Sequence, residues 1–285
     1  MKPAILGISG PRLAADERAL FRAHPHRGVI LFARNIQNPS QLADLIADLR
    51  DILPPGAVLM VDQEGGRVAR LKPPHWPALP AAGTLRDAAA AYAHGRALGA
   101  MVKAAGFDVT AAPVLDLRHP GASDVIGDRA ITGGPETVAQ LGGKIAEGIL
   151  AEGVIPVMKH LPGHGRALVD SHLDLPRVPP VDLSDDFLPF IANKHLPWAM
   201  TAHVMFEQYD KVNPATVSST VISEIIRGKI GFAGTLLSDD LAMHALSGRP
   251  EERARAALAA GCDIALYCPG DFAGNRAVLE ALDER

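Results

Sequence analysis

The stretch from Lys159 to His172 gathers residue types that transfer protons or bind hydroxyl groups. It reads Lys159-His160-Leu161-Pro162-Gly163-His164-Gly165 and then, after Arg166 to Val169, Asp170-Ser171-His172. Glycines on both sides of His164 favour a loop that can move. On this loop Asp170 can hold one imidazole nitrogen of His172, which raises the basicity of the ring and leaves the other nitrogen to exchange a proton with a substrate. Asp170 and His172 are therefore our candidates for acid/base catalysis, although most Asp-x-His pairs in proteins are surface features.

Histidines in this region also raise the alternative of a catalytic zinc ion. Zinc hydrolases usually carry compact ligand sets, such as His-x-His on a strand or His-Glu-x-x-His on a helix. Neither spacing occurs among His160, His164, His172 and His203. We therefore expect no metal and no other cofactor.

Short apolar runs rich in β-branched residues alternate with longer segments of helical period, a pattern typical of βα units around a parallel sheet. The predicted strands are 4–8, 29–32, 58–61, 109–112, 155–158, 199–202, 236–238 and 264–267. The predicted helices include 41–51, 85–105, 135–152, 221–228, 251–260 and 273–283. Prolines at the first turn support several of the helix starts.

Eight such units without a break in composition predict an α/β fold, a single (β/α)8 TIM-type barrel. The length of 285 residues fits the roughly 250 residues of such a barrel, so we expect one catalytic domain over 1–285. A doubly wound open sheet is the competing fold, but no Gly-x-Gly-x-x-Gly turn follows the first predicted strand.

Charged and imidazole groups follow four of the predicted strands directly. In an α/β barrel all βα loops open at the carboxyl ends of the strands, so these groups should meet at one mouth. Ion pairs that only stabilise the mouth would use the same residue types, but the coincidence over four strands favours a binding site. The groups are Asp62, Lys159 with His160, His203, and Asp239 with Asp240.

Composition excludes several other classes of protein. Lys and Arg number 28 against 32 Asp and Glu, and the basic residues do not cluster, so we expect no nucleic-acid partner. No stretch approaches the roughly 20 apolar residues of a membrane helix, and the apolar run at 4–8 is too short for a signal-peptide core. We expect a soluble, cytoplasmic monomer in which Cys262 and Cys268 are buried free thiols.

Together these motifs resemble the family 3 glycoside hydrolases, and within them the bacterial cytoplasmic β-N-acetylglucosaminidases of cell-wall recycling. The resemblance runs from about residue 25 to about 245. Small departures are Leu161, where Phe is common, and Ala130-Ile131, where Ser and an aromatic residue are common. Its motifs are residues 159–165, 170–172 and Ser238-Asp239-Asp240-Leu241-Ala242-Met243, with support from 28–32, 62–70 and 213–218.

This resemblance implies a retaining exo-β-N-acetylglucosaminidase that releases terminal N-acetylglucosamine from peptidoglycan fragments, the muropeptides. Matched by motif, Asp239 is the nucleophile that forms a covalent glycosyl ester, and His172 is the acid/base with Asp170 behind it. The family pattern, and not the spacing, selects Asp239 over Asp240. The residues expected to bind the sugar are Asp62, Arg70, Arg129, Lys159 and His160, and His203 at the end of the sixth strand completes the set.

Physical reasoning agrees with these roles. A nucleophile must be placed to a fraction of an ångström, which suits a strand end, whereas an imidazole on a loop can donate a proton and later remove one near neutral pH. Since a neutral imidazole adds no negative charge beside the glycosyl ester, phosphate as an acceptor is a further hypothesis. Two alternatives stay open, an inactive sugar-binding barrel and a β-glucosidase-type family member, although the latter usually takes its acid/base from a further domain.

Overall fold

Parallel strands that alternate with helices form a barrel. In the computed structural model, which describes residues 1–171 and 173–282, eight strands pair in the order β10-β1-β2-β3-β4-β5-β7-β9. Leu237 and Ile264 form a bridge between the ends of this order, and Ser238 N donates to Ile264 O at 2.9 Å, so the sheet closes. The predicted (β/α)8 barrel is confirmed. The strands are β1 Lys2–Leu6, β2 His26–Leu31, β3 Val58–Val61, β4 Val109–Thr110, β5 Ile155–Leu161, β7 Trp198–Thr201, β9 Thr235–Leu237 and β10 Ala265–Tyr267.

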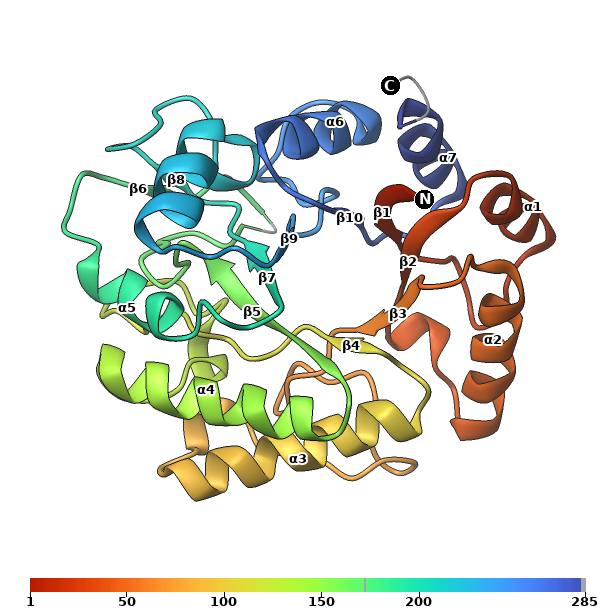
Figure 1. Cartoon of the computed structure of the whole chain (residues 1–285), viewed down its shortest axis with the longest axis horizontal. Coiled ribbons are helices and arrows are strands. Elements are labelled where there is room, and N and C mark those ends of the chain that lie inside the picture. Colours follow the sequence, from red (N-terminus) through yellow and green to blue (C-terminus); the bar gives the residue numbers. More distant parts are fainter. Residues whose placement is uncertain (172, 283–285) are drawn as a thin grey trace.

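Helices surround the strands as a ring (Figure 1). They are α1 Ala15–Ala23, α2 Pro39–Ile52, α3 Ala88–Ala104, α4 Pro135–Ala151, α5 Ser184–Ala192, the π-helix η5 Val221–Lys229, α6 Pro250–Ala260 and α7 Phe272–Ala281. The six predicted helices are all present; the end of the predicted segment 273–283 falls partly outside the described residues. Sequence reasoning missed α1 and α5, which are only nine residues long, and α5 contains Pro189, normally a helix breaker.

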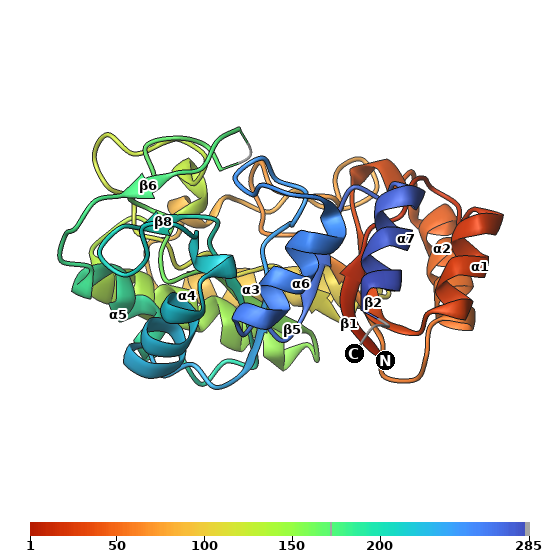
Figure 2. The same ribbon diagram turned by 90° about the horizontal axis from the view of Figure 1, so that it is seen from above.

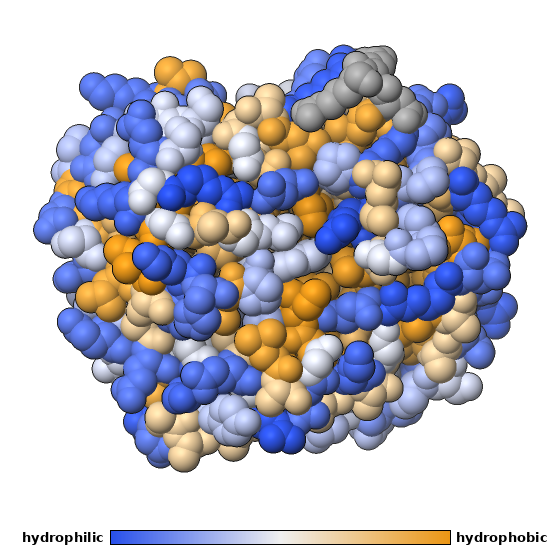
Figure 3. Space-filling model, in the orientation of Figure 1, coloured by the Kyte–Doolittle hydropathy of each residue, from blue (hydrophilic) through white to orange (hydrophobic). Residues whose placement is uncertain are grey.

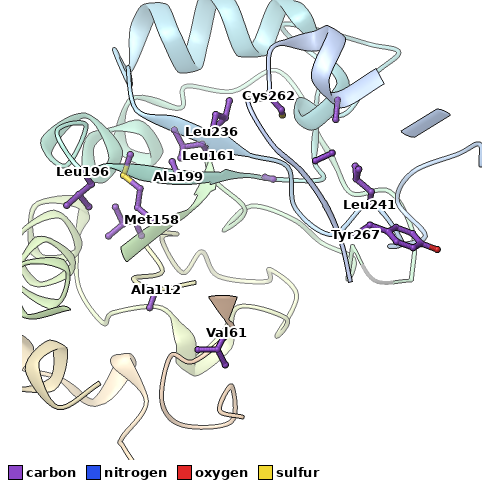
Figure 4. Packing of buried hydrophobic residues seen from close by; sticks show 14 of the residues in the cluster. Val61, Ala112, Met158, Leu161, Leu196, Ala199, Leu236, Leu241, Cys262 and Tyr267 are labelled. Atoms are coloured by element: carbon purple, nitrogen blue, oxygen red, sulfur yellow. The ribbon is translucent and has the colours of Figure 1, made fainter. Parts of the chain in front are cut away.

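Alternation along the strands divides the apolar side chains into two sets. One set fills the barrel interior, for example Ile5, Ile30 and Met60. Their strand neighbours Leu6 and Leu31 belong to the larger cluster under the helices. Figure 4 shows part of that larger cluster, with Val61, Met158, Ala199 and Leu236 directed to the outer side of the strands. This division follows from the two-residue period of a strand.

Strand β5 departs from this regular period where it enters the site. Its register with β7 shifts between Met158 and Leu161. In a regular strand only one of two consecutive side chains would face inward, yet both Lys159 and His160 line the same cavity. An irregularity of this kind re-aims side chains next to active sites.

Long loops leave the carboxyl ends of the strands on one side of the barrel. A short parallel pair, β6 Arg177–Val178 with β8 Met205–Phe206, ties the loops that follow β5 and β7 (Figure 2). On the opposite face, where β1 begins, hydrophilic and hydrophobic residues are mixed (Figure 3). Within residues 1–171 and 173–282 no helix is long and apolar enough to cross a membrane.

His26 makes stability depend on pH. The ring is buried at the start of β2 against Phe21, with Nδ1 2.9 Å from His24 O. Burial lowers the pKa of His26 to about 4, although the hydrogen bond to His24 opposes the shift. Because the unfolded chain binds this proton below about pH 6.5, the folded state loses stability as the pH falls from 6.5 towards 4.

We therefore expect the His26→Asn variant, which stays neutral, to lose less stability than the parent between pH 7 and 4.5, by about 2 kcal/mol. Urea unfolding at the two pH values measures this difference. An equal pH dependence in both proteins would show that His26 does not titrate as its burial requires.

Candidate active site

A cavity of about 280 Å³ opens at the carboxyl ends of the strands. All the predicted site residues line it except His203 and His172, and the latter lies outside the described residues. Its polar lining is Asp62, Arg67, Arg70, Arg129, Lys159, His160, His164, Asp170, Ser171, Asp239 and Asp240. Its apolar and thiol lining is Ile30, Phe32, Val68, Ala111, Val125, Ile126, Met200, Met243, Leu266 and Cys268. The lining thus combines apolar side chains with charged ones, which are called the charged wall below, and such a combination is typical of small-molecule sites.

Lys159 is the centre of a network of buried charges. Its Nζ lies 2.9 Å from Asp62 Oδ1 and 2.5 Å from Glu64 Oε1. Arg70 donates to the other oxygen of Asp62 at 2.8 Å. Arg129 binds Glu64 with two hydrogen bonds, of 2.9 and 2.8 Å. The network joins the loop after β3, the loop after β4 and the end of β5, so it fixes these three segments relative to one another.

These charges keep one another ionised. Burial raises the pKa of Glu64, but the charges of Lys159 and Arg129 outweigh this effect and lower the pKa to about 2. Burial lowers the pKa of Lys159, but Asp62 and Glu64 outweigh it, so this pKa is raised. The cavity therefore presents the charged ammonium of Lys159 and the charged guanidinium of Arg129, which can bind hydroxyl and amide groups of a ligand through charge-assisted hydrogen bonds.

Asp116, fully buried in the loop after β4, orients two histidines. Its Oδ2 accepts from His160 Nδ1 at 2.6 Å, and its Oδ1 accepts from the backbone N–H of His164 at 2.7 Å. Because a carboxylate can only accept, His160 Nδ1 carries a proton, and Nε2 is the nitrogen that remains for a ligand. Sequence reasoning missed Asp116, and the available signal was a carboxylate inside the apolar run 114–117.

Asp239 and Asp240 are neighbours in very different environments. Burial opposes the charge of Asp239, but His203, His160 and the N–H of Asp240 outweigh it, and the pKa is lowered. Burial raises the pKa of Asp240, whose Oδ1 accepts from the backbone of Ala242 and Cys268, each at 3.0 Å. Asp239 is thus the carboxylate that stays ionised in the cavity, whereas Asp240 supports the turn after β9.

His203 lies behind the cavity and not in its lining. The ring is fully buried, with Nδ1 2.7 Å from Thr216 Oγ1 and Nε2 2.9 Å from Asp240 O. Since a carbonyl only accepts, Nε2 carries the proton, and Nδ1 accepts from Thr216. The sequence predicts that His203 contacts the sugar, but the ring lies outside the cavity lining. His203 instead holds the backbone of the Asp239–Asp240 turn.

The loop after β5 reaches the cavity as predicted. Asp170 and Ser171 both line it, and His164 Nε2 lies 3.0 Å from Ser171 Oγ. Further residues that sequence reasoning did not assign to the site are Glu64, His164, Ser171, Arg67 and Cys268. Cys268 and Cys262 are buried free thiols, as predicted.

Comparison with known proteins identifies the family. The family described as "Glycosyl hydrolase family 3 N terminal domain" matches residues 4–284. The chain belongs to glycosyl hydrolase family 3. It is 43% identical over 283 residues to a β-hexosaminidase of Alkalilimnicola ehrlichii, covering 93% of this chain and 80% of that protein. A β-hexosaminidase of Pseudomonas aeruginosa is 41% identical, with 98% of this chain and 85% of that protein covered.

Solved structures agree with these relatives. NagZ of Neisseria gonorrhoeae in complex with N-trifluoroacetyl-D-glucosamine superimposes with a TM-score of 0.87 at 34% identity, covering 99% of this chain and 89% of that one. A family 3 β-N-acetylglucosaminidase of Paenibacillus sp. gives 0.91 at 34% identity, covering 98% of this chain. The chain spans 56% of the Paenibacillus protein. These findings make the protein a glycoside hydrolase of the β-hexosaminidase type.

The charge network predicts the effect of Glu64→Gln. This change leaves Lys159 and Arg129 without one buried counter-charge, and breaking such a buried pair costs about 3 kcal/mol. We expect a loss of unfolding free energy of that order and at least about a tenfold loss of kcat/KM. Urea unfolding and hydrolysis of 4-nitrophenyl glycosides measure the two effects.

Glu147→Gln is the matched control, because it removes the same charge from an exposed pair with Lys144 on α4. Its effect should stay within about 0.5 kcal/mol. Equal effects of the two changes would contradict the central position that we give to the Lys159 network.

Proposed function

We propose that the protein is a retaining exo-β-N-acetylglucosaminidase that uses Asp239 as its nucleophile. The proposed substrate is a peptidoglycan fragment with a terminal N-acetylglucosamine, such as GlcNAc-1,4-anhydro-N-acetylmuramic acid and its peptides. The observation that carries the proposal is Asp239, a partly buried carboxylate with a lowered pKa that lines a small cavity beside six cationic or imidazole groups. The muropeptide substrate, and a monomeric cytoplasmic enzyme, rest on the resemblance described above.

The charged wall supports binding of a single terminal sugar. Asp62, which accepts from both Lys159 and Arg70, is placed to accept a hydrogen bond from a sugar hydroxyl, and the cations can donate to hydroxyl oxygens. His160 adds Nε2, since its Nδ1 is committed to Asp116. Arg129 is held by Glu64 and donates to the carbonyl of Val125, a loop residue that also lines the cavity. The small volume of the cavity, about 280 Å³, supports exo-type cleavage of a single terminal sugar.

The reaction then proceeds in two steps. Asp239 attacks the anomeric carbon while the acid/base protonates the leaving oxygen, which gives a glycosyl–Asp239 ester and releases the aglycone. The same group then removes a proton from water as the water attacks the ester, which frees the sugar with its original anomeric configuration. We assign the acid/base role to His172, assisted by Asp170, which lines the cavity. His203, which holds the Asp239–Asp240 turn, is proposed as a positioning residue and no longer as a sugar contact.

Trapping the enzyme with a 5-fluoro N-acetylglucosamine analogue tests the nucleophile. The slow second step should leave the sugar on Asp239, identified by peptide mass spectrometry. Asp239→Asn should lower kcat by at least about 10³-fold without loss of folding, and it should keep its affinity for N-acetylglucosamine. A label on Asp240, or turnover in the variant, would overturn the assignment.

Substrate choice tests the alternatives. We expect hydrolysis of 4-nitrophenyl β-N-acetylglucosaminide to exceed that of the β-glucoside by about 10³-fold, because polar groups built to bind the acetamido group are left unpaired by glucose. Preference for the glucoside would favour the β-glucosidase-type alternative. Sugar binding without turnover of either substrate would indicate an inactive barrel.

The pH dependence of kcat/KM distinguishes the titration of Asp239 from that of the acid/base. Because the pKa of Asp239 is lowered, its protonation can reduce kcat/KM only at the acid end of the profile. Loss of activity at higher pH reflects the acid/base losing its proton. The negative charge of Asp170 raises the pKa of a neighbouring imidazole, so Asp170→Asn should shift this alkaline limb to lower pH. An unshifted limb would argue against the pairing of Asp170 with the acid/base.

A further inference from the structure

Ser171 stands between the two residues of the proposed acid/base pair in the sequence. Its side chain is buried and lines the cavity, and Oγ lies 3.0 Å from His164 Nε2. Its neighbours are more exposed to solvent: Asp170 is half-buried, and Leu168 and Val169 are exposed. Ser171 is therefore the point at which this loop is fixed to the interior of the site.

His164 is itself held by the rigid part of the barrel. Its backbone N–H donates to Asp116, and its ring lies edge-on to His160 with the ring centres 5.6 Å apart. The next residue, Gly165, packs so closely on the backbone of Leu117 that a Cβ atom would lie 1.7 Å from Leu117 O. The position of His164 is thus set by Asp116 and Leu117 in the loop after β4.

Among the described residues, the ring of His164 makes a single side-chain hydrogen bond, the one between Nε2 and Ser171. Nδ1 is buried and has no hydrogen-bond partner within residues 1–171 and 173–282. Burial, with the neighbouring His160, lowers the pKa of His164 to about 4, so the ring is neutral near pH 7. A hydrogen bond between a neutral imidazole and a hydroxyl contributes about 1 kcal/mol, enough to bias the position of a loop without locking it.

We propose that His164 is a positioning residue that acts through Ser171 to hold the acid/base loop against the cavity. The inference rests on the proposed function, because it assigns the proton-transfer role to this loop. Asp116 then organises both halves of the site. It orients His160 towards the sugar and, through His164 and Ser171, places Asp170 beside the leaving group.

This role has a signature that a purely structural role lacks. Proton donation matters when the leaving group is a poor one, because a good leaving group departs without a proton. Loosening the loop should therefore reduce the rate of the first step for poor leaving groups much more than for good ones. A general loss of folding or of sugar binding would reduce both rates equally.

The test compares Ser171→Ala with Ser171→Thr, which keeps a hydroxyl. Two N-acetylglucosaminides serve as substrates, one with a 2,4-dinitrophenyl and one with a 4-methoxyphenyl leaving group. We expect Ser171→Ala to lose at least about tenfold in kcat/KM on the methoxyphenyl substrate and less than about threefold on the dinitrophenyl substrate. Ser171→Thr should recover most of the loss. Ser223→Ala, which removes an exposed hydroxyl on η5, is the control and should change neither rate.

His164→Asn and the double variant with Ser171→Ala complete a thermodynamic cycle. If the two side chains act as a unit, the double variant should lose no more than the poorer single variant. Equal losses on both substrates, or additive losses in the double variant, would overturn the positioning role. Failure of the parent to hydrolyse either N-acetylglucosaminide would instead contradict the proposed function. Thermal unfolding of each variant confirms that folded proteins are compared, and Ser171→Thr with His164→Asn keeps the test open should Ser171→Ala not fold.

Discussion

The position of the Lys159 ammonium between Asp62 and Glu64 is the constraint on which the rest of the site depends. An ammonium group in this buried position is tolerated only with close counter-charges, and those carboxylates in turn require Arg70 and Arg129. The five groups come from the loops after β3 and β4 and from the end of β5. The ion pairs among these five groups therefore fix the relative position of three βα units, and with it the charged wall of the cavity.

Asp239 and Asp240 show how a barrel gives adjacent carboxylates different tasks. Backbone N–H groups of Ala242 and Cys268 bind Oδ1 of Asp240, which therefore acts as part of the turn. Asp239 faces the cavity, and the groups around it favour its ionised form. His203 supports both residues from behind through the carbonyl of Asp240. The difference comes from the surroundings and not from the residue type.

Asp116 links the sugar-binding wall to the loop that carries the proposed acid/base. A fully buried carboxylate needs several donors, and here the donors are His160 and the backbone of His164. These hydrogen bonds fix the start of the loop after β5 relative to the strand ends. Strand ends thus hold the proposed nucleophile, Asp62, Lys159 and His160, and the charge network fixes the loops that carry Arg70 and Arg129. The proposed acid/base instead belongs to a loop with exposed apolar residues.

Sequence by itself determined the barrel, the set of strand ends that bear polar groups and most of the cavity lining. These follow from hydrophobic periodicity and from the rule that all βα loops of a barrel open on one face. Tertiary structure alone decided that His203 lies behind the cavity, that Asp116 and Glu64 are central to it, and that both Lys159 and His160 face inward. Each of these depends on contacts between distant segments or on an irregular register in β5, and local pattern carries no signal for either. The short helices α1 and α5 were missed for a related reason, since packing against the barrel, more than their own sequence, stabilises them.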